Sequence, residues 1–146
     1  MKKEGGFSLL ELLIVVGIIL IIATIAIPAL LRSRQSANES SAVANLKTIN
    51  TAEATYILSS SGNFGSVTDL MTGGLLDSRF STPVSGYLFA VTASGPDYTA
   101  TATPSAINGG RFGYYTLPDS VIRYASALSS TCVPCFPSGR SGQPVQ

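Results

Sequence analysis

One acidic residue, Glu11, lies just inside a long apolar segment near the start of the chain. The segment runs from Leu9 to Ile27, and Glu11 carries its only charge. A carboxylate at membrane depth is costly, so such a residue is expected to have a function and a partner. Nineteen residues in helical form span about 28 Å, which is close to the hydrocarbon thickness of a bilayer. The sequence therefore predicts a membrane-spanning helix with one functional carboxylate.

Two other interpretations of the apolar segment fit less well. About 115 remaining residues are too few to enclose a core helix that is apolar on every side. A secretory signal would end its apolar region after about 7–15 residues at a small-residue site, whereas the nearest Ala-x-Ala sequence is at residues 42–44. Lys2 and Lys3 precede the segment and Arg32 and Arg34 follow it. The positive-inside count is thus balanced and leaves the orientation open.

The composition argues against an enzyme. The 146 residues carry a net charge of +1 and include no histidine, the commonest general base and metal ligand. We find no Gly-x-Ser-x-Gly motif and no glycine-rich phosphate loop, so we expect no catalysis and no cofactor. No basic patch indicates an obligate nucleic-acid partner. Four acidic residues occur singly and do not favour a calcium site: they are Asp69, Asp77, Asp97 and Asp119.

The start of the chain has the pattern of a processed precursor. Residues 1–6, MKKEGG, form a short charged leader that ends in glycine, and Phe7-Ser8-Leu9-Leu10-Glu11 follows. This resembles the signal of type IV prepilins and of type II secretion pseudopilins. The family has a basic leader, a glycine before the cut, a phenylalanine after it and a glutamate five residues into the mature chain. A proline, here Pro28, ends the apolar span, and the resemblance covers residues 1–31.

The resemblance implies a pathway for the chain. A prepilin peptidase on the cytoplasmic side would cut between Gly6 and Phe7 and methylate the new Phe7 amine. The precursor would cross the bacterial inner membrane once, with its N-terminus in the cytoplasm. The assembled form would be an extracellular pilus or a periplasmic pseudopilus. Its partners would be further copies in a helical filament, an inner-membrane assembly platform and a cytoplasmic ATPase.

The same resemblance gives Glu11 and Pro28 their expected roles. Glu11 of an incoming subunit would pair with the Phe7 ammonium of its neighbour, which fixes an axial stagger of about one helical turn. The alternative is a Glu11 that reaches the membrane interface and pairs with nothing. Pro28 cannot donate a hydrogen bond and clashes with the Thr24 carbonyl, which favours a kink or local melting over residues 24–28. Leu20 stands where many pilins have glycine, so the extent of melting is open.

The helix is expected to continue beyond Pro28 with one apolar face. A stripe at three- and four-residue spacing should pack on a globular head, while Asn38, Glu39, Lys47 and Asn50 lie off it. A serine run and Gly62 predict the helix end. The members of the stripe are Ala42, Leu46, Ile49, Ala52, Glu53 and Tyr56.

A small antiparallel sheet should complete the head. Strands are expected at 86–92 and 98–103, joined by a turn at 94–97, and at 111–117 and 121–125. Residues 66–69 match a capping box for a short helix over 67–71, and 72–85 is predicted to be a loop. We expect the aromatic side chains to pack between sheet and helix: Tyr87, Phe89, Tyr98, Phe112, Tyr114, Tyr115 and Tyr124. A conductive role for these rings is the less favoured alternative.

The predicted fold class is thus α+β, a long N-terminal helix on a C-terminal antiparallel sheet. The tail holds Cys132 and Cys135 in a Ser/Gly/Pro-rich stretch without a helix or second Cys pair. Outside the cytoplasm a small-loop disulfide is the default expectation for this pair, and residues 139–146 are expected to dangle. The predicted divisions are a cleaved leader (1–6), a transmembrane or filament-core helix (7–28), an amphipathic half (29–58), a globular region (59–125) and a flexible tail (126–146).

The predicted function is a type IV pilus subunit, with a type II secretion pseudopilin as the alternative. A single-pass protein that never polymerises is a third class, in which Phe7 and Glu11 would tolerate substitution. The sequence does not distinguish a major from a minor subunit. It also leaves open adhesion, twitching, DNA uptake, secretion or electron transfer, and use of the glycosylation sequon at Asn38.

Overall fold

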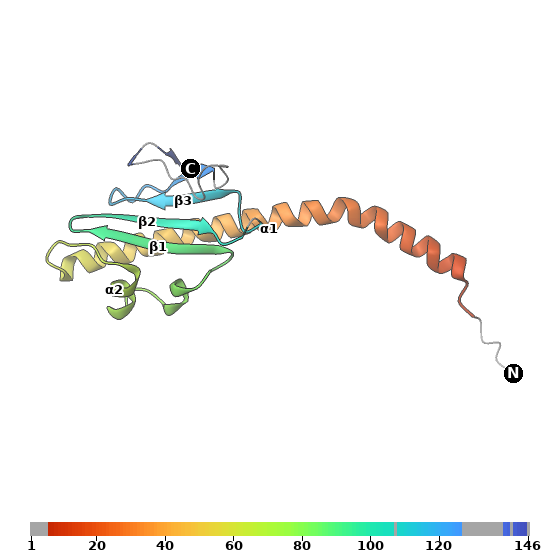
Figure 1. The fold of residues 1–146 in the computed structure, drawn as a ribbon, viewed down its shortest axis with the longest axis horizontal. Coiled ribbons are helices and arrows are strands. Elements are labelled where there is room, and N and C mark those ends of the chain that lie inside the picture. Colours follow the sequence, from red (N-terminus) through yellow and green to blue (C-terminus); the bar gives the residue numbers. More distant parts are fainter. Residues whose placement is uncertain (1–5, 107, 127–138, 141, 146) are drawn as a thin grey trace. The chain divides into compact units, whose positions relative to one another are not determined.

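The computed structural model describes residues 6–106, 108–126, 139–140 and 142–145. The chain divides into two compact units, Met1–Arg34 and Gln35–Gln146. The first unit contains the apolar start of helix α1 (Leu9–Ser59), and the second contains the rest of α1 together with the sheet (Figure 1). Helix α1 begins two residues later than the predicted span, since residues 6–8 are not helical.

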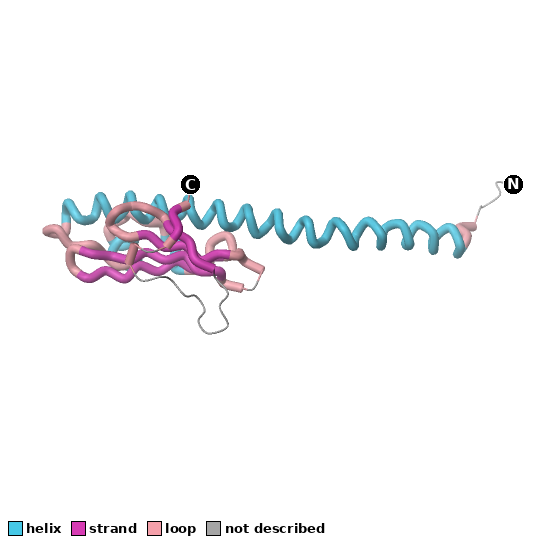
Figure 2. Tube along the Cα trace, turned by 90° about the horizontal axis from the view of Figure 1, so that it is seen from above, coloured by secondary structure: helices cyan, strands magenta, loops and turns pink. Residues whose placement is uncertain are grey.

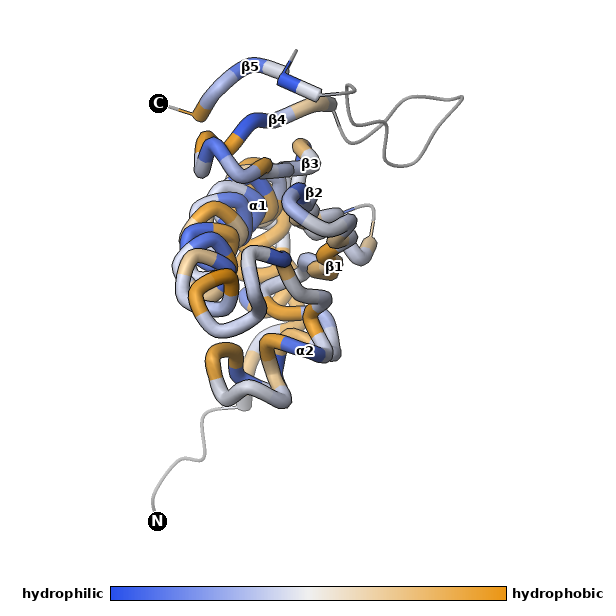
Figure 3. The backbone as a smooth tube through the Cα atoms, turned by 90° about the vertical axis from the view of Figure 1, so that its left-hand side faces the viewer, coloured by the Kyte–Doolittle hydropathy of each residue, from blue (hydrophilic) through white to orange (hydrophobic). Residues whose placement is uncertain are grey.

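The second unit, hereafter the head, packs one helix on one sheet. All neighbouring strands are antiparallel and follow the chain in the order β1-β2-β3-β4-β5. Figures 2 and 3 show α1 against one face of this sheet. The predicted α+β class is therefore confirmed. Besides α1, the elements are α2 (Val67–Thr72), η1 (Ser78–Ser81), β1 (Tyr87–Ser94), β2 (Asp97–Pro104), β3 (Phe112–Thr116), β4 (Arg123–Ser126) and β5 (Gln143–Pro144).

The core forms where the predicted stripe of α1 meets the inward face of the sheet. Leu46 and Ile49 are fully buried, as is Ala100 on β2. On β2 the buried Tyr98, Ala100 and Ala102 alternate with threonines, because successive side chains of a strand point to opposite faces. Removal of this apolar surface from water drives the packing of helix on sheet.

Two predictions about side-chain placement are wrong. Tyr114 and Tyr115 were both expected between sheet and helix. Only Tyr114 lies there, beside Tyr87 at 6.0 Å between ring centroids. Strand alternation places Tyr115 on the opposite face, where its hydroxyl accepts the Gly142 N–H. Glu39 and Asn50 were placed off the buried stripe of α1, yet both are buried because they border it at helical spacing.

The local turn chemistry follows the sequence. Ser66 and Asp69 form the predicted capping box at the start of α2. Gly95 has φ of +60° at the first central position of the β1–β2 turn, and Pro96 follows it, as in a type II′ hairpin. The predicted loop over 72–85 contains one 3₁₀ turn, η1, at whose start the Asp77 side chain accepts the Arg79 N–H.

The C-terminal end differs from the prediction. Gln143 and Pro144 form strand β5 on the edge of β4, and the Val145 N–H donates to the Ile122 carbonyl. These backbone hydrogen bonds fix a segment that was expected to dangle. Short pairings of this kind carry little sequence signal, because any residue with a free N–H or C=O can make them.

Candidate functional site

The predicted processing and assembly residues lie at the exposed start of the first unit. Gly6, Phe7 and Ser8 precede the helix, and the Ser8 carbonyl accepts the Leu12 N–H at 3.2 Å. The Phe7 side chain is 76% exposed. Glu11 is exposed in the first turn of α1, where the helix dipole favours an acidic side chain. The Gly6–Phe7 bond thus belongs to a non-helical, accessible stretch.

Glu11 lacks a partner within the described part of the chain. No hydrogen bond or ion pair to its carboxylate is found among the described residues. Glu11 is therefore an exposed acidic residue without a hydrogen-bond or ion-pair partner among the described residues.

The first part of α1 presents apolar side chains around its whole circumference. Its most apolar 18-residue window has a mean hydropathy of 3.0, and none of that window is buried within the molecule. The helix is long and apolar enough to cross a membrane. Such a surface needs lipid or other protein around it. The large exposed side chains include Leu10, Leu13, Ile14, Ile18, Ile21, Ile22, Ile25 and Leu30.

Helix α1 continues through Pro28 without a break in helical residues. Proline has no N–H, so the Thr24 carbonyl loses its usual intrahelical donor. In the same turn, the Thr24 hydroxyl donates to the Ile21 carbonyl at 2.7 Å. Melting over 24–28, expected for the assembled state, stays a prediction.

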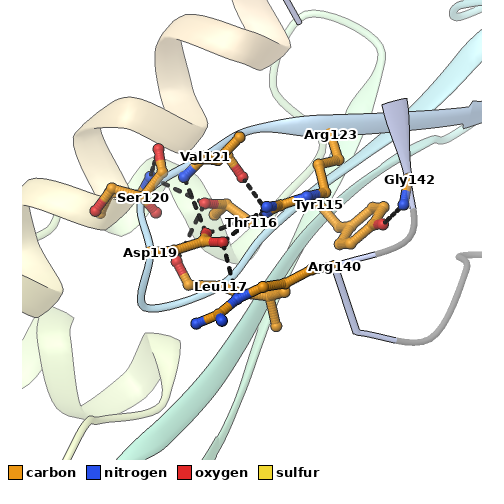
Figure 4. A network of polar contacts seen from close by, with 10 residues as sticks. Tyr115, Thr116, Leu117, Asp119, Ser120, Val121, Arg123, Arg140 and Gly142 are labelled. Carbon is orange, nitrogen blue, oxygen red and sulfur yellow. Dashed lines mark hydrogen bonds and ion pairs between the residues drawn. The ribbon is translucent and has the colours of Figure 1, made fainter. Parts of the chain in front are cut away.

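Cys132 and Cys135 lie outside the described residues, but the chain on both sides of them is anchored. The Asp119 carboxylate accepts hydrogen bonds from Arg123 at 2.7 and 3.1 Å and lies 3.2 Å from the Arg140 guanidinium (Figure 4). Hydrogen bonds from Arg123, the Val121 N–H and the two positive charges together lower the pKa of Asp119 below its usual value. This network joins the β3–β4 turn to the C-terminal segment.

Two buried carboxylates of the head were not among the predicted functional residues. Glu39 accepts three hydrogen bonds from Arg111, one from its backbone and two from its guanidinium. Burial would raise the pKa of Glu39, but these bonds and the positive charge of Arg111 outweigh burial and lower it. Glu53 is fully buried, and burial raises its pKa. The predicted stripe of α1 already included Glu53, and its burial agrees with that prediction. Glu39 was placed off the stripe, although its three-residue spacing to Ala42 could have revealed its burial.

The scattered aspartates serve as caps and ion-pair partners. Asp69 caps α2, Asp77 caps η1 and Asp119 binds two arginines. Within the described ranges no three His, Cys, Asp or Glu residues gather in a way that could hold a metal ion.

The comparisons with known proteins agree with this arrangement. Residues 1–27 match the family model of the prokaryotic N-terminal methylation motif. The chain is 32% identical over 132 residues to the type IV wide pilus major component PilA4 of Thermus thermophilus, covering 90% of this chain and 95% of that protein. It is 45% identical over 54 residues to the type IV major pilin protein PilA of Myxococcus xanthus, covering 37% of this chain and 24% of that one. No solved structure matches. With an N-terminal methylation motif, an unburied apolar helix and a relative aligned along nearly its whole length, the chain belongs to the type IV pilin family.

Proposed function

We propose that this chain is a structural subunit of a type IV pilus that polymerises through the apolar part of α1. One observation carries the proposal: a helical window of mean hydropathy 3.0 has no buried residue within the molecule. Lipid can cover that surface before assembly, and the same part of other copies can cover it afterwards. The similarity to two major pilins supports polymerisation as the end state.

Processing at Gly6–Phe7 is the first proposed step. A prepilin peptidase would cut this bond on the cytoplasmic side and methylate the Phe7 amine. The non-helical backbone of residues 6–8 and the exposed Phe7 side chain support access by such an enzyme. An inner-membrane platform and a cytoplasmic ATPase would then supply the work of extracting the subunit from the membrane.

Pairing of Glu11 with a neighbour's Phe7 ammonium is the second proposed step. The carboxylate lacks a partner among the described residues, and an unpaired carboxylate at membrane depth costs on the order of a few kcal/mol. A neighbouring ammonium removes that cost and adds a charge-assisted hydrogen bond. The pair would set the register between subunits, while the apolar surface would supply most of the burial.

The decisive experiment is intact-mass spectrometry of protein sheared from the cell surface, with sequencing of the terminal fragment. We expect abundant chains that begin at methylated Phe7. Processed chains confined to the envelope would instead favour a periplasmic pseudopilin or a minor pilus subunit. Chains that still begin at Met1 would contradict processing at Gly6–Phe7.

A further inference from the structure

Glu53 is a buried carboxyl group of the head with one oxygen that has no hydrogen-bond partner among the described residues. The Glu53 side chain, in the last turns of α1, is fully buried. Its Oε2 accepts the Gly65 N–H at 3.1 Å, whereas its Oε1 has no hydrogen-bond partner among the described residues. A fully ionised carboxylate in such a place is strongly disfavoured, because neither a cation nor a second donor compensates for lost hydration.

Glu53 holds the start of the segment that links α1 to the sheet. The Phe64 N–H donates to the Gly95 carbonyl, and the Phe64 ring lies 4.6 Å from that of Tyr98. Gly65 is bound by Glu53, and Ser66 caps α2 through Asp69. Three consecutive residues of this segment are therefore fixed, each by a different element. We call residues 63–72 the latch.

The packing around Gly65 leaves no space for a side chain. A Cβ atom at this position would lie 2.9 Å from the Tyr56 ring and 3.2 Å from the Asp69 Cβ. Only glycine lets the backbone come close enough for its N–H to reach Glu53. Gly65 therefore ties the latch directly to the Glu53 carboxyl group.

The surroundings of Glu53 are anionic or neutral on every element that faces it. Asp69 faces it from α2 and Tyr98 from β2, while the Tyr56 ring lies beside its hydrogen-bond partner Gly65. The Asp69 charge opposes a second negative charge on Glu53. The Tyr98 hydroxyl does not relieve it, because it donates to the Asn50 Oδ1 at 3.0 Å. No described cation is paired with Glu53.

From this geometry we propose that Glu53 is a proton-binding site of the folded head and that its protonation closes the latch over residues 63–72. Loss of the proton leaves a buried charge beside Asp69 and loosens the latch. The segment between α1 and β1 then becomes a part of the pilin head whose order depends on the pH of the medium.

The sign of the effect follows from linkage. Burial, opposed by the Gly65 hydrogen bond and assisted by Asp69, raises the pKa of Glu53 in the folded head. The head therefore takes up a proton on folding at intermediate pH. The stabilisation is fully present below the unfolded pKa of Glu53 and is lost as the pH rises through the folded pKa.

Two measurements on the full-length protein in detergent micelles test the proposal. The first is the infrared band of protonated carboxylic acids in ¹³C-glutamate-labelled protein, titrated from about pH 4 to about pH 9. The second is hydrogen exchange of residues 63–72, corrected for the pH dependence of intrinsic exchange. In the wild type we expect protection to fall by up to about tenfold per pH unit between the unfolded and folded pKa of Glu53. The infrared band should vanish only as the pH rises through the folded pKa of Glu53.

Glu53→Gln is the informative variant, and Glu39→Gln is its matched control on the same helix. Glu53→Gln keeps an acceptor for the Gly65 N–H and cannot ionise, so we expect latch protection that no longer depends on pH. Above the unfolded pKa of Glu39, where its carboxylate is ionised in both states, Glu39→Gln should leave the acid band and the slope of latch protection as in the wild type. An unchanged pH dependence in Glu53→Gln would overturn the proposal. If that variant fails to fold, a wild-type acid band that is already lost where exposed glutamates ionise would overturn it equally.

Discussion

The Glu39 carboxylate, on α1, accepts three hydrogen bonds from Arg111, which lies 72 residues later in the chain and immediately precedes β3. Next to this pair, the Asn38 side chain donates to the Gly109 carbonyl at 2.9 Å. Two successive residues of α1 thus fix the segment that leads into the middle strand of the sheet. The Glu39–Arg111 pair thus stabilises the packing of α1 on the sheet.

Glu39→Gln should destabilise the head at neutral pH by about 1.5 to 3 kcal/mol, the usual worth of hydrogen bonds to a charged group. The pKa of Glu39 is lowered in the folded state, so its contribution is present above the unfolded pKa and is lost as the pH falls through the folded pKa. The variant should therefore differ from the wild type at pH 7 and approach it in acid. Thermal unfolding across a pH series measures this, and a constant difference at all pH values would contradict it.

Glu11→Ala should leave the protein inserted in the membrane and processed, yet without filaments. The reason is the loss of the only charge in the apolar segment, which we propose to pair with a neighbour's Phe7 ammonium. Glu11→Gln should assemble poorly as well, since an amide cannot form the ion pair. Leu13→Ala, which removes apolar surface two residues later, is the control and should retain most assembly. Electron microscopy of sheared fractions gives the yield, and normal filaments from Glu11→Ala would disprove the pairing.

Pro28→Ala should restore the missing hydrogen bond to the Thr24 carbonyl and stiffen the helix between residues 24 and 28. If local melting accompanies assembly, as we propose, filament yield should fall while membrane insertion and processing remain normal. Quantitative immunoblots of the sheared and membrane fractions separate these effects. A filament yield equal to that of the wild type would show that assembly does not require melting.

Tyr98→Phe should cost about 1–3 kcal/mol of stability, because it leaves the buried Asn50 Oδ1 without its donor. Tyr124→Phe is the matched control, since the Tyr124 hydroxyl donates to the Gln143 Oε1 at an exposed site. The control should change stability by less than about 1 kcal/mol, because water replaces the lost partner. Chemical denaturation of both variants tests the contrast, and equal effects would argue against a buried network.

Asp119→Asn should loosen the C-terminal edge of the sheet more than Arg140→Ala does. The aspartate binds both Arg123 and Arg140, whereas Arg140 is 74% exposed and its loss leaves the Arg123 pair intact. Hydrogen exchange of the Val145 N–H, which donates to the Ile122 carbonyl, reports the difference. Greater exchange in Arg140→Ala than in Asp119→Asn would place the anchor elsewhere.

Much of the fold follows from local signals that do not depend on distant residues. The capping box at Ser66 and the Gly95-Pro96 turn need only neighbouring residues, and both form as predicted. The alternation of Tyr98, Ala100 and Ala102 with threonines predicts one covered face, and burial confirms it. Helical periodicity predicted burial less well for polar residues that border the apolar stripe of α1. Glu39 and Asn50 look solvent-facing by residue type, yet the sheet covers them.

The sequence by itself determined the membrane-length helix, the lone Glu11 within it, the α+β class and membership in the pilin family, because composition, period and motif are local properties of the chain. Only the tertiary structure decided the partners of the head. It brings Arg111 to Glu39, encloses Glu53 beside Gly65 and binds Arg140 to Asp119. It also adds β5 to the sheet. These contacts join positions far apart in the chain, and they depend on how helix and sheet exclude water between them, which no local pattern encodes.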